Sequence, residues 1–206
     1  MNFLGHLYLA GTDPNIRLGN FIADHIKGIP LSHFSPRIRE GIMMHRAIDY
    51  FTDSHPAMAE CRRLLRPGYA KYAGVALDVV LDFYLADNWH LFSNTPLRPF
   101  LAKFYLQLLI RWRWLPPFWK RMLPGFIQDN RIYRYRKIDG ICESLDIMSR
   151  TTSLPDASLF ARGVMEEHYN FFLNKLLIFI PAIAAEMDRQ FGILPIKLPP
   201  AEPESC

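Results

Sequence analysis

An all-α, single-domain protein is what the sequence predicts, and three observations support that prediction. Strand signals are scarce, because no segment of alternating polar and apolar residues is bounded by hairpin turns. Long runs at residues 100–113 and 165–183 have the length and composition of helices. The chain has 206 residues and is 50% hydrophobic, which suffices to bury one substantial core. We therefore expect a single helical domain at residues 1–193.

The amino-terminal part of the chain is expected to form two hydrophobic helical runs that carry metal-competent side chains. His6 lies within the segment Asn2–Leu7, and Asp24 and His25 end the segment Gly19–His25. A histidine or aspartate in an apolar run is costly to bury unless it converges with partners or with a metal ion. The two segments are therefore candidates for one shared site.

The segment Gly41–Pro56 is the most informative stretch, because it places ionisable groups among apolar residues at helical spacing. On a helix, His45, Asp49 and Asp53 project from one side, since each is four residues from the next. Arg46 lies beside them, and the apolar stripe of the same helix comprises Ile42, Ala47, Ile48 and Phe51. The pattern indicates a site at the edge of the core. The alternative is a core-edge histidine that bonds a carboxylate, with arginine as counter-ion.

The end of this segment also has a structural interpretation. A new helix can begin here, with Asp53 or Ser54 as its N-cap and Pro56 at its first position. We favour that interpretation for Asp53. For His55 the structural and the functional interpretation remain equal.

A third candidate segment, Leu77–Trp89, is expected to be a largely buried helix. Asp78 and Asp82 share one of its faces by four-residue spacing. Two carboxylates on a mostly apolar helix repel each other unless a cation or an arginine lies between them.

Taken together, the segments offer a mixed imidazole and carboxylate set that suits Mn²⁺, Fe²⁺ or Mg²⁺ in phosphate chemistry. The set comprises His6, Asp24, His45 and Asp78. A thiolate zinc site or a disulfide framework has no support, because Cys61, Cys142 and Cys206 are scattered. This cysteine usage fits a reducing cytoplasm.

The positive charge of the chain is concentrated in one segment. Residues 98–138 contain ten Lys and Arg residues and one Asp, a net charge of +9, which leaves −5 for the rest of a chain whose total is +4. Such a segment can steer an acidic partner. A nucleic-acid surface or a solvated basic face would have the same charge. The candidate partner-binding residues are Arg111, Arg113, Arg131, Arg134 and Arg136.

Four motifs carry a resemblance to a known family: N-F-L-x-H-L at residues 2–7, G-N-x-x-x-D at residues 19–24, G-I-x-x-H-R-x-I-D-x-x-T-D-x-H-P at residues 41–56, and D-x-x-x-D at Asp78 and Asp82, followed by Trp89. Looser similarity continues through residues 145–150, which include Arg150, and His168-Tyr169. The chain resembles the bacterial acyl carrier protein phosphodiesterases, an all-helical, noncanonical relative of the HD-type metal phosphohydrolases. The resemblance spans nearly the whole chain.

This resemblance implies hydrolysis of the phosphodiester that joins 4′-phosphopantetheine to a serine of acyl carrier protein, which returns holo carrier to the apo form. It implies a divalent metal, Mn²⁺ first, in a shell made of His6, Asp24, His45 and Asp78. Asp49 and Asp82 then serve as supporting groups or as the base, and Arg46 contacts the phosphate. Acyl carrier proteins are small and acidic, which accounts for the basic segment, so no nucleic-acid partner is expected.

One departure from the family pattern bears on activity. The family's second acidic motif usually runs Asp-His, but here Phe83 follows Asp82. Either His25 or His55 replaces that histidine, or some activity is lost. Two alternative functions therefore stay open: hydrolysis of a nucleotide or other small phosphodiester, and a non-catalytic helical protein that binds a carrier protein or a membrane surface.

We expect a cytoplasmic protein without a membrane span. The amino terminus lacks a basic n-region and a small-residue cleavage site. The run at residues 100–119 is interrupted by Lys103, Arg111 and Arg113, and the run at residues 171–183 is too short. The aromatic residues of the basic segment can contact a membrane surface, accept an acyl or pantetheine chain, or cover the core, which is the most frequent role. Residues 194–206 are proline-rich and are expected to form a flexible or extended tail.

Overall fold

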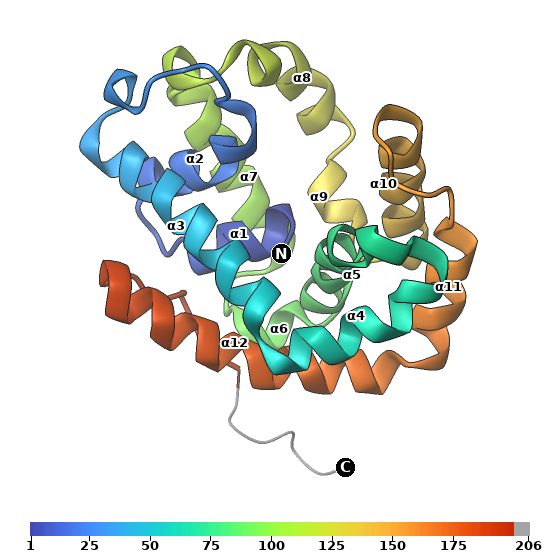
Figure 1. The fold of residues 1–206 in the computed structure, drawn as a ribbon. Coiled ribbons are helices and arrows are strands. Elements are labelled where there is room, and N and C mark those ends of the chain that lie inside the picture. Colours follow the sequence, from blue (N-terminus) through green and yellow to red (C-terminus); the bar gives the residue numbers. More distant parts are fainter. Residues whose placement is uncertain (200–206) are drawn as a thin grey trace.

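Helices account for all regular structure in the part of the protein that the structure describes. The computed structural model describes residues 1–199, and no strand occurs within them (Figure 1). The α-helices are α1 (Phe3–Leu9), α2 (Pro14–Ile22), α3 (Pro36–Ser54), α4 (Pro56–Tyr69), α5 (Ala73–Asp87), α6 (Trp89–Phe92), α7 (Leu97–Ile110), α8 (Pro117–Gln128), α9 (Arg131–Arg134), α10 (Ile138–Thr151), α11 (Ser158–Glu167) and α12 (Tyr169–Phe191). Short 3₁₀ helices are η1 (Ala23–His25), η2 (Leu31–His33), η3 (Ala70–Tyr72) and η4 (Trp112–Trp114). The all-α prediction is confirmed.

Helix α5 forms the centre of the bundle. It packs against α1, α4, α10 and α12, and most of its side chains are buried, as its nearly continuous apolar composition requires. In Figure 1 the long helix α12 runs along one side of α3 and α4, whereas α8, α9 and α10 lie toward the opposite end of the molecule. The short helix α1 is held in the interior between α2 and α5.

Two glycines allow α2 and α3 to touch backbone to backbone. A Cβ atom on Gly19 of α2 would lie 2.0 Å from the carbonyl oxygen of Ile38, and one on Gly41 of α3 would lie 2.2 Å from the carbonyl oxygen of Ile16. Real Cβ atoms do not approach so closely, so a larger residue at either position must separate the helices. Both glycines open motifs that carry candidate site residues one or two turns later.

A buried carboxylate anchors α1 on α5. The Oδ2 and Oδ1 atoms of Asp82 accept hydrogen bonds from the backbone N–H groups of Leu4 and Gly5, at 2.7 and 3.0 Å. These N–H groups belong to the first turn of α1, which has no partner for them within its own helix. Burial raises the pKa of Asp82 to about 7, and the two N–H groups oppose that rise.

The boundary between α3 and α4 corrects one prediction. Pro56 is the first residue of α4, as expected, but the N-cap is His55, whose Nδ1 accepts from the backbone N–H of Ala57 at 3.2 Å. Asp53 instead lies in the last turn of α3, where it pairs with Arg62 at 3.3 Å. The prediction that Asp53 or Ser54 is the cap was wrong because α3 continues for one more turn, through Ser54.

Helix α12 is longer than the sequence suggested. It runs for 23 residues with Pro181 inside it, so by length and composition alone it is a helix that could cross a membrane. The expectation that this stretch is too short was therefore wrong. However, α12 packs against α3, α4, α5 and α11, and it buries Phe172, Leu176 and Phe179. Of its most apolar window, 39% is buried inside the protein, so core contacts account for part of its apolar composition.

The described part of the carboxy-terminal segment, residues 194–199, has no helix and lies along the protein surface. The carbonyl oxygen of Lys197 accepts a hydrogen bond from the hydroxyl of Tyr8, and the Nζ of Lys197 donates to the carbonyl oxygen of His90 at 3.2 Å. Pro195 and Pro199 are buried. The rest of the predicted tail, residues 200–206, lies outside the described residues.

We expect Gly41→Ala to destabilise the protein by at least about 2 kcal/mol, because its methyl group would meet the backbone of α2. The matched control is Gly163→Ala in α11, where a Cβ would have no neighbour within 4 Å. This control should gain about 0.5 to 1 kcal/mol from helix propensity. Urea unfolding of both variants measures the difference, and equal effects at the two positions would contradict the close contact.

Candidate functional site

Four side chains predicted from the sequence meet where α1, η1 and α3 come together. His6 comes from α1, Asp24 from η1, and His45 and Asp49 from α3. We call these four residues the His/Asp cluster. The imidazole rings of His6 and His45 are stacked with centroids 4.1 Å apart. The helical spacing of His45 and Asp49 thus places both on the side of α3 that faces α1.

The carboxylates of the cluster hold the two imidazoles from the solvent side. Asp49 bridges them, because its Oδ1 lies 3.1 Å from His6 Nε2 and its Oδ2 lies 3.1 Å from His45 Nε2. Asp24 Oδ1 lies 3.1 Å from the same His45 nitrogen. The histidine side chains are 5% and 8% exposed, whereas those of Asp49 and Asp24 are 42% and 71% exposed. The cluster is therefore buried on its imidazole side and open on its carboxylate side.

The side chain of Asn20 holds the ring of His6 from the side opposite Asp49. Asn20 Oδ1 lies 2.8 Å from His6 Nδ1, and Asp49 Oδ1 lies 3.1 Å from His6 Nε2. Polar partners thus contact both ring nitrogens of His6 and fix the orientation of the ring.

Burial and mutual contacts shift the pKa values of the cluster in opposite directions. Burial, and then the nearby charge of His45, lowers the pKa of His6, so its ring is neutral near pH 7. Burial also disfavours the charged form of His45, but hydrogen bonds to Asp24 and Asp49 outweigh it and raise its pKa to about 9. For Asp49, burial acts upward, yet the two imidazoles hold the carboxyl pKa far below its usual range.

The donor set fits a divalent metal ion. His6, His45 and Asp49 each offer a ligand atom, and these atoms lie within 4.8 Å of one another. Asp24 adds a carboxylate oxygen at the exposed edge. Two imidazole nitrogens with carboxylate oxygens suit Mn²⁺ or Fe²⁺ better than a soft thiolate-seeking ion, and Asn20 orients His6 from behind. The sequence pointed to the segment that contains Asn20 but not to this residue.

The remaining predicted site residues lie beside the cluster rather than in it. Asp78 Oδ1 accepts from the terminal amine of Met1 at 2.8 Å, and the same amine lies 4.0 Å from Asp49 Oδ1. Burial disfavours the charged amine, but Asp78 and Asp49 outweigh it and raise the amine pKa. Asp82 faces the backbone of α1. Arg46 is exposed, with no hydrogen bond or ion pair among residues 1–199.

Phe83, at the position where the family usually has histidine, packs away from the cluster. Its ring is buried, with centroids 5.0 Å from that of Tyr84 and 6.1 Å from that of Tyr169 on α12. His55, one of its possible replacements, caps α4. His25, the other, stacks on Phe118 with ring centroids 3.9 Å apart and follows Asp24 directly in η1.

An apolar cleft of about 460 Å³ adjoins the His/Asp cluster. It shares Asn2, Phe3 and Asp24 with the small cavity at His6 and His45. Most of its wall comes from α8 and α10, chiefly Phe118, Trp119, Met122, Phe126, Ile147 and Met148. The cleft therefore offers an apolar surface that leads to the exposed edge of the cluster.

The five arginines proposed for partner binding have separate local environments. Arg111 donates to Asn15 Oδ1 at 2.8 Å, and Arg134 pairs with Glu143 at 2.7 Å. The guanidinium of Arg113 lies 4.8 Å from the ring centroid of Trp114, and that of Arg136 lies 4.6 Å from the ring centroid of Tyr133. Arg131 lines the apolar cleft. Among them, only Arg131 lines the cleft that adjoins the cluster.

Comparisons with known proteins agree on one family. The family model described as acyl carrier protein phosphodiesterase matches residues 1–183. Curated proteins of that name from Salmonella paratyphi A, Salmonella dublin and Salmonella agona are each 31% identical to the chain over 191 residues, covering 92% of this chain and 99% of the relative. No solved structure matches the chain. The resemblance carried by the sequence motifs is thus confirmed, and the chain belongs to the acyl carrier protein phosphodiesterase family.

Proposed function

We propose that this protein is a metal-dependent phosphodiesterase that removes 4′-phosphopantetheine from holo acyl carrier protein and releases the apo form. The observation that carries the proposal is the bridging of two stacked, buried imidazoles by Asp49, whose two carboxylate oxygens lie 3.1 Å from His6 Nε2 and from His45 Nε2. Such a set calls for a divalent cation. The names of the family and of the Salmonella relatives supply the substrate.

In this proposal His6, His45 and Asp49 hold the metal ion, and Asp24 completes the set from the exposed edge. The bound ion would polarise the phosphoryl oxygens and lower the pKa of a coordinated water. The hydrogen bond from His45 is the largest influence on Asp24 and lowers its pKa, so Asp24 is ionised near pH 7. Its exposed carboxylate can orient the water and accept a proton from it.

The bond changes follow from the products. Water oxygen bonds to phosphorus, the bond from phosphorus to the serine oxygen breaks, and that serine oxygen takes up a proton. Asp49 assumes the role that the sequence gave to Asp78, because it lies between the two imidazoles whereas Asp78 is occupied by the Met1 amine. Asp82 supports the site indirectly by anchoring α1, which carries His6.

The apolar cleft supports a substrate with a long extension on its phosphate. A pantetheine arm is a flexible chain with apolar stretches, and its binding would bury apolar surface in the cleft. The phosphate would then lie where the cleft meets the cluster cavity, beside the shared residues Asn2, Phe3 and Asp24.

We expect the wild type to convert holo to apo acyl carrier protein in the presence of Mn²⁺. Asp49→Asn should not do so, because it should bind Mn²⁺ more than about 100-fold more weakly. Intact mass spectrometry follows the loss of phosphopantetheine, and isothermal titration follows metal binding. The control is Asp188→Asn at an exposed site on α12. Bound metal without conversion would shift the substrate to other phosphodiesters, and the absence of both would favour a non-catalytic binding protein.

Metal affinity should rise with pH. Because the pKa of His45 is raised to about 9, the metal-free protein holds a proton there that the ion must displace. Affinity should therefore increase about tenfold per unit from pH 6.5 to 8.5 and level off above pH 9. Titrations at pH 7 in buffers of different ionisation enthalpy should detect release of about one proton. A pH-independent affinity with no proton release would contradict ligation by His45.

Filling the cleft should weaken the binding of holo carrier protein, which carries the pantetheine arm, and leave the hydrolysis of a small phosphodiester unchanged. Gly125 of α8 lines the cleft, and a Cβ there would have no neighbour within 4 Å, so Gly125→Trp can fold and still occupy the space. We expect its KM for holo carrier protein to rise at least about tenfold while hydrolysis of bis(para-nitrophenyl) phosphate is retained. Gly163→Trp, at an equally open helical glycine, is the control. An unchanged KM in Gly125→Trp would place the arm elsewhere.

A further inference from the structure

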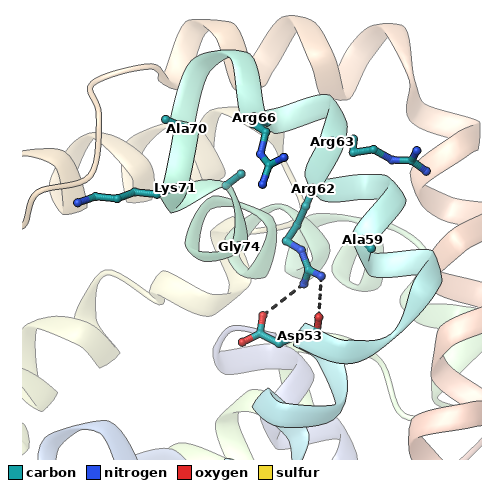
Figure 2. Close-up of a pocket in the computed structure, with 9 residues that line it drawn as sticks. Asp53, Ala59, Arg62, Arg63, Arg66, Ala70, Lys71 and Gly74 are labelled. Atoms are coloured by element: carbon teal, nitrogen blue, oxygen red, sulfur yellow. Dashed lines mark hydrogen bonds and ion pairs between the residues drawn. The ribbon is translucent and has the colours of Figure 1, made fainter.

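A second concave surface, with a basic lining, lies between the end of α3, the helix α4 and the start of α5. Its volume is about 470 Å³ (Figure 2). We call this surface the basic pocket, because four cationic side chains line it: Arg62, Arg63, Arg66 and Lys71. The sequence does not reveal this pocket, because three of the four residues are on one helix and the fourth follows a turn.

The charge of the basic pocket is largely unpaired. Its one carboxylate, Asp53, is paired with Arg62, which also donates to the Asp53 carbonyl oxygen at 2.6 Å (Figure 2). Arg63, Arg66 and Lys71 are exposed and form no ion pair within residues 1–199. Four cations and one carboxylate leave a net charge of +3. Like charges around one concavity repel each other, so an anionic occupant would relieve the repulsion.

Helix α3 runs from the basic pocket to the His/Asp cluster, and α5 runs from the pocket to Asp78, which lies beside the cluster. Asp53 follows Asp49 by one turn on α3, and Gly74 precedes Asp78 by one turn on α5. One turn corresponds to a rise of about 6 Å. The apolar cleft reaches the same cluster through Asn2, Phe3 and Asp24, and the two concavities share no lining residue. Two chemically different surfaces thus adjoin one candidate metal centre.

We propose that the basic pocket docks an acidic surface of the carrier protein, next to the serine whose phosphodiester enters the His/Asp cluster. This inference rests on the proposed function, and it divides the substrate between two surfaces: the arm in the apolar cleft and the protein in the basic pocket. Carboxylates suit the pocket because guanidinium groups bind them through paired hydrogen bonds. The phosphodiester itself belongs at the cluster, one turn away.

The basic segment highlighted by the sequence is less suited to this task. Arg134 is already paired with Glu143, and Arg111 is tied to Asn15. In contrast, Arg63 and Arg66 stand one turn apart on the exposed side of α4 with no acidic partner. Arg113 and Arg136 lie on the rings of Trp114 and Tyr133, and neither lines the apolar cleft or the small cavity at His6 and His45. Unpaired cations gathered around one concavity favour the approach of an acidic protein surface.

The test is the double variant Arg63→Glu/Arg66→Glu, with Arg113→Glu/Arg136→Glu as the matched charge reversal in the sequence-predicted segment. At low salt the first should raise KM for holo carrier protein at least about tenfold, with kcat and the hydrolysis of bis(para-nitrophenyl) phosphate unchanged. The control should change KM by less than about twofold. A carrier protein whose acidic residues near the modified serine are replaced by lysine should bind the first variant better than it binds wild type.

Several results would overturn the docking inference while leaving the proposed function intact. One is an unchanged KM for holo carrier protein in Arg63→Glu/Arg66→Glu, and another is an equal rise of KM in the control variant. A third is that Arg63→Glu/Arg66→Glu loses the binding of inorganic phosphate but keeps the binding of carrier protein. If wild type does not hydrolyse carrier protein, the proposed function fails. In that event fluorescence anisotropy of labelled apo carrier protein still tests docking, since binding must be lost in the first variant and kept in the control.

Discussion

The close contact between α2 and α3 is the constraint on which the candidate site depends. Gly19 and Gly41 let the two backbones approach to a distance that no side chain would allow. Asp24 follows directly from α2 in η1, and His45 lies one turn beyond Gly41 on α3. A methyl group at either glycine would push the helices apart, and with them the elements that carry His45 and Asp24, whose side chains lie 3.1 Å apart.

A second, electrostatic constraint places His6 against this helix pair. Helix α1 has only seven residues and could not persist alone. The buried carboxylate of Asp82 ties its first turn to α5, and Asn20 of α2 then fixes the ring of His6 from the other side. Asp82, which the sequence offered as a supporting group or as the base, thus binds the backbone of α1 and positions His6.

The fold class and four of the clustered side chains could be predicted, because apolar periodicity and four-residue spacing are local properties of the sequence. The positions of Asp49 and Asp78 could not be predicted. Asp49 lies between two imidazoles and Asp78 meets the Met1 amine, and both contacts arise only in the folded chain. The basic pocket escaped prediction for a similar reason: its charges are few in sequence but converge at a helix turn. Net charge along the sequence favoured a segment whose cations are partly neutralised in space.

The proposed activity requires a metal ion at the His/Asp cluster. The most direct measurement is the anomalous scattering of a crystal soaked with Mn²⁺, recorded on both sides of the manganese absorption edge. We expect a peak within about 2.2 Å of His6 Nε2, His45 Nε2 and an oxygen of Asp49. A strong peak at Asp78 and Met1 instead, or none at the His/Asp cluster at saturating Mn²⁺, would contradict the proposed centre.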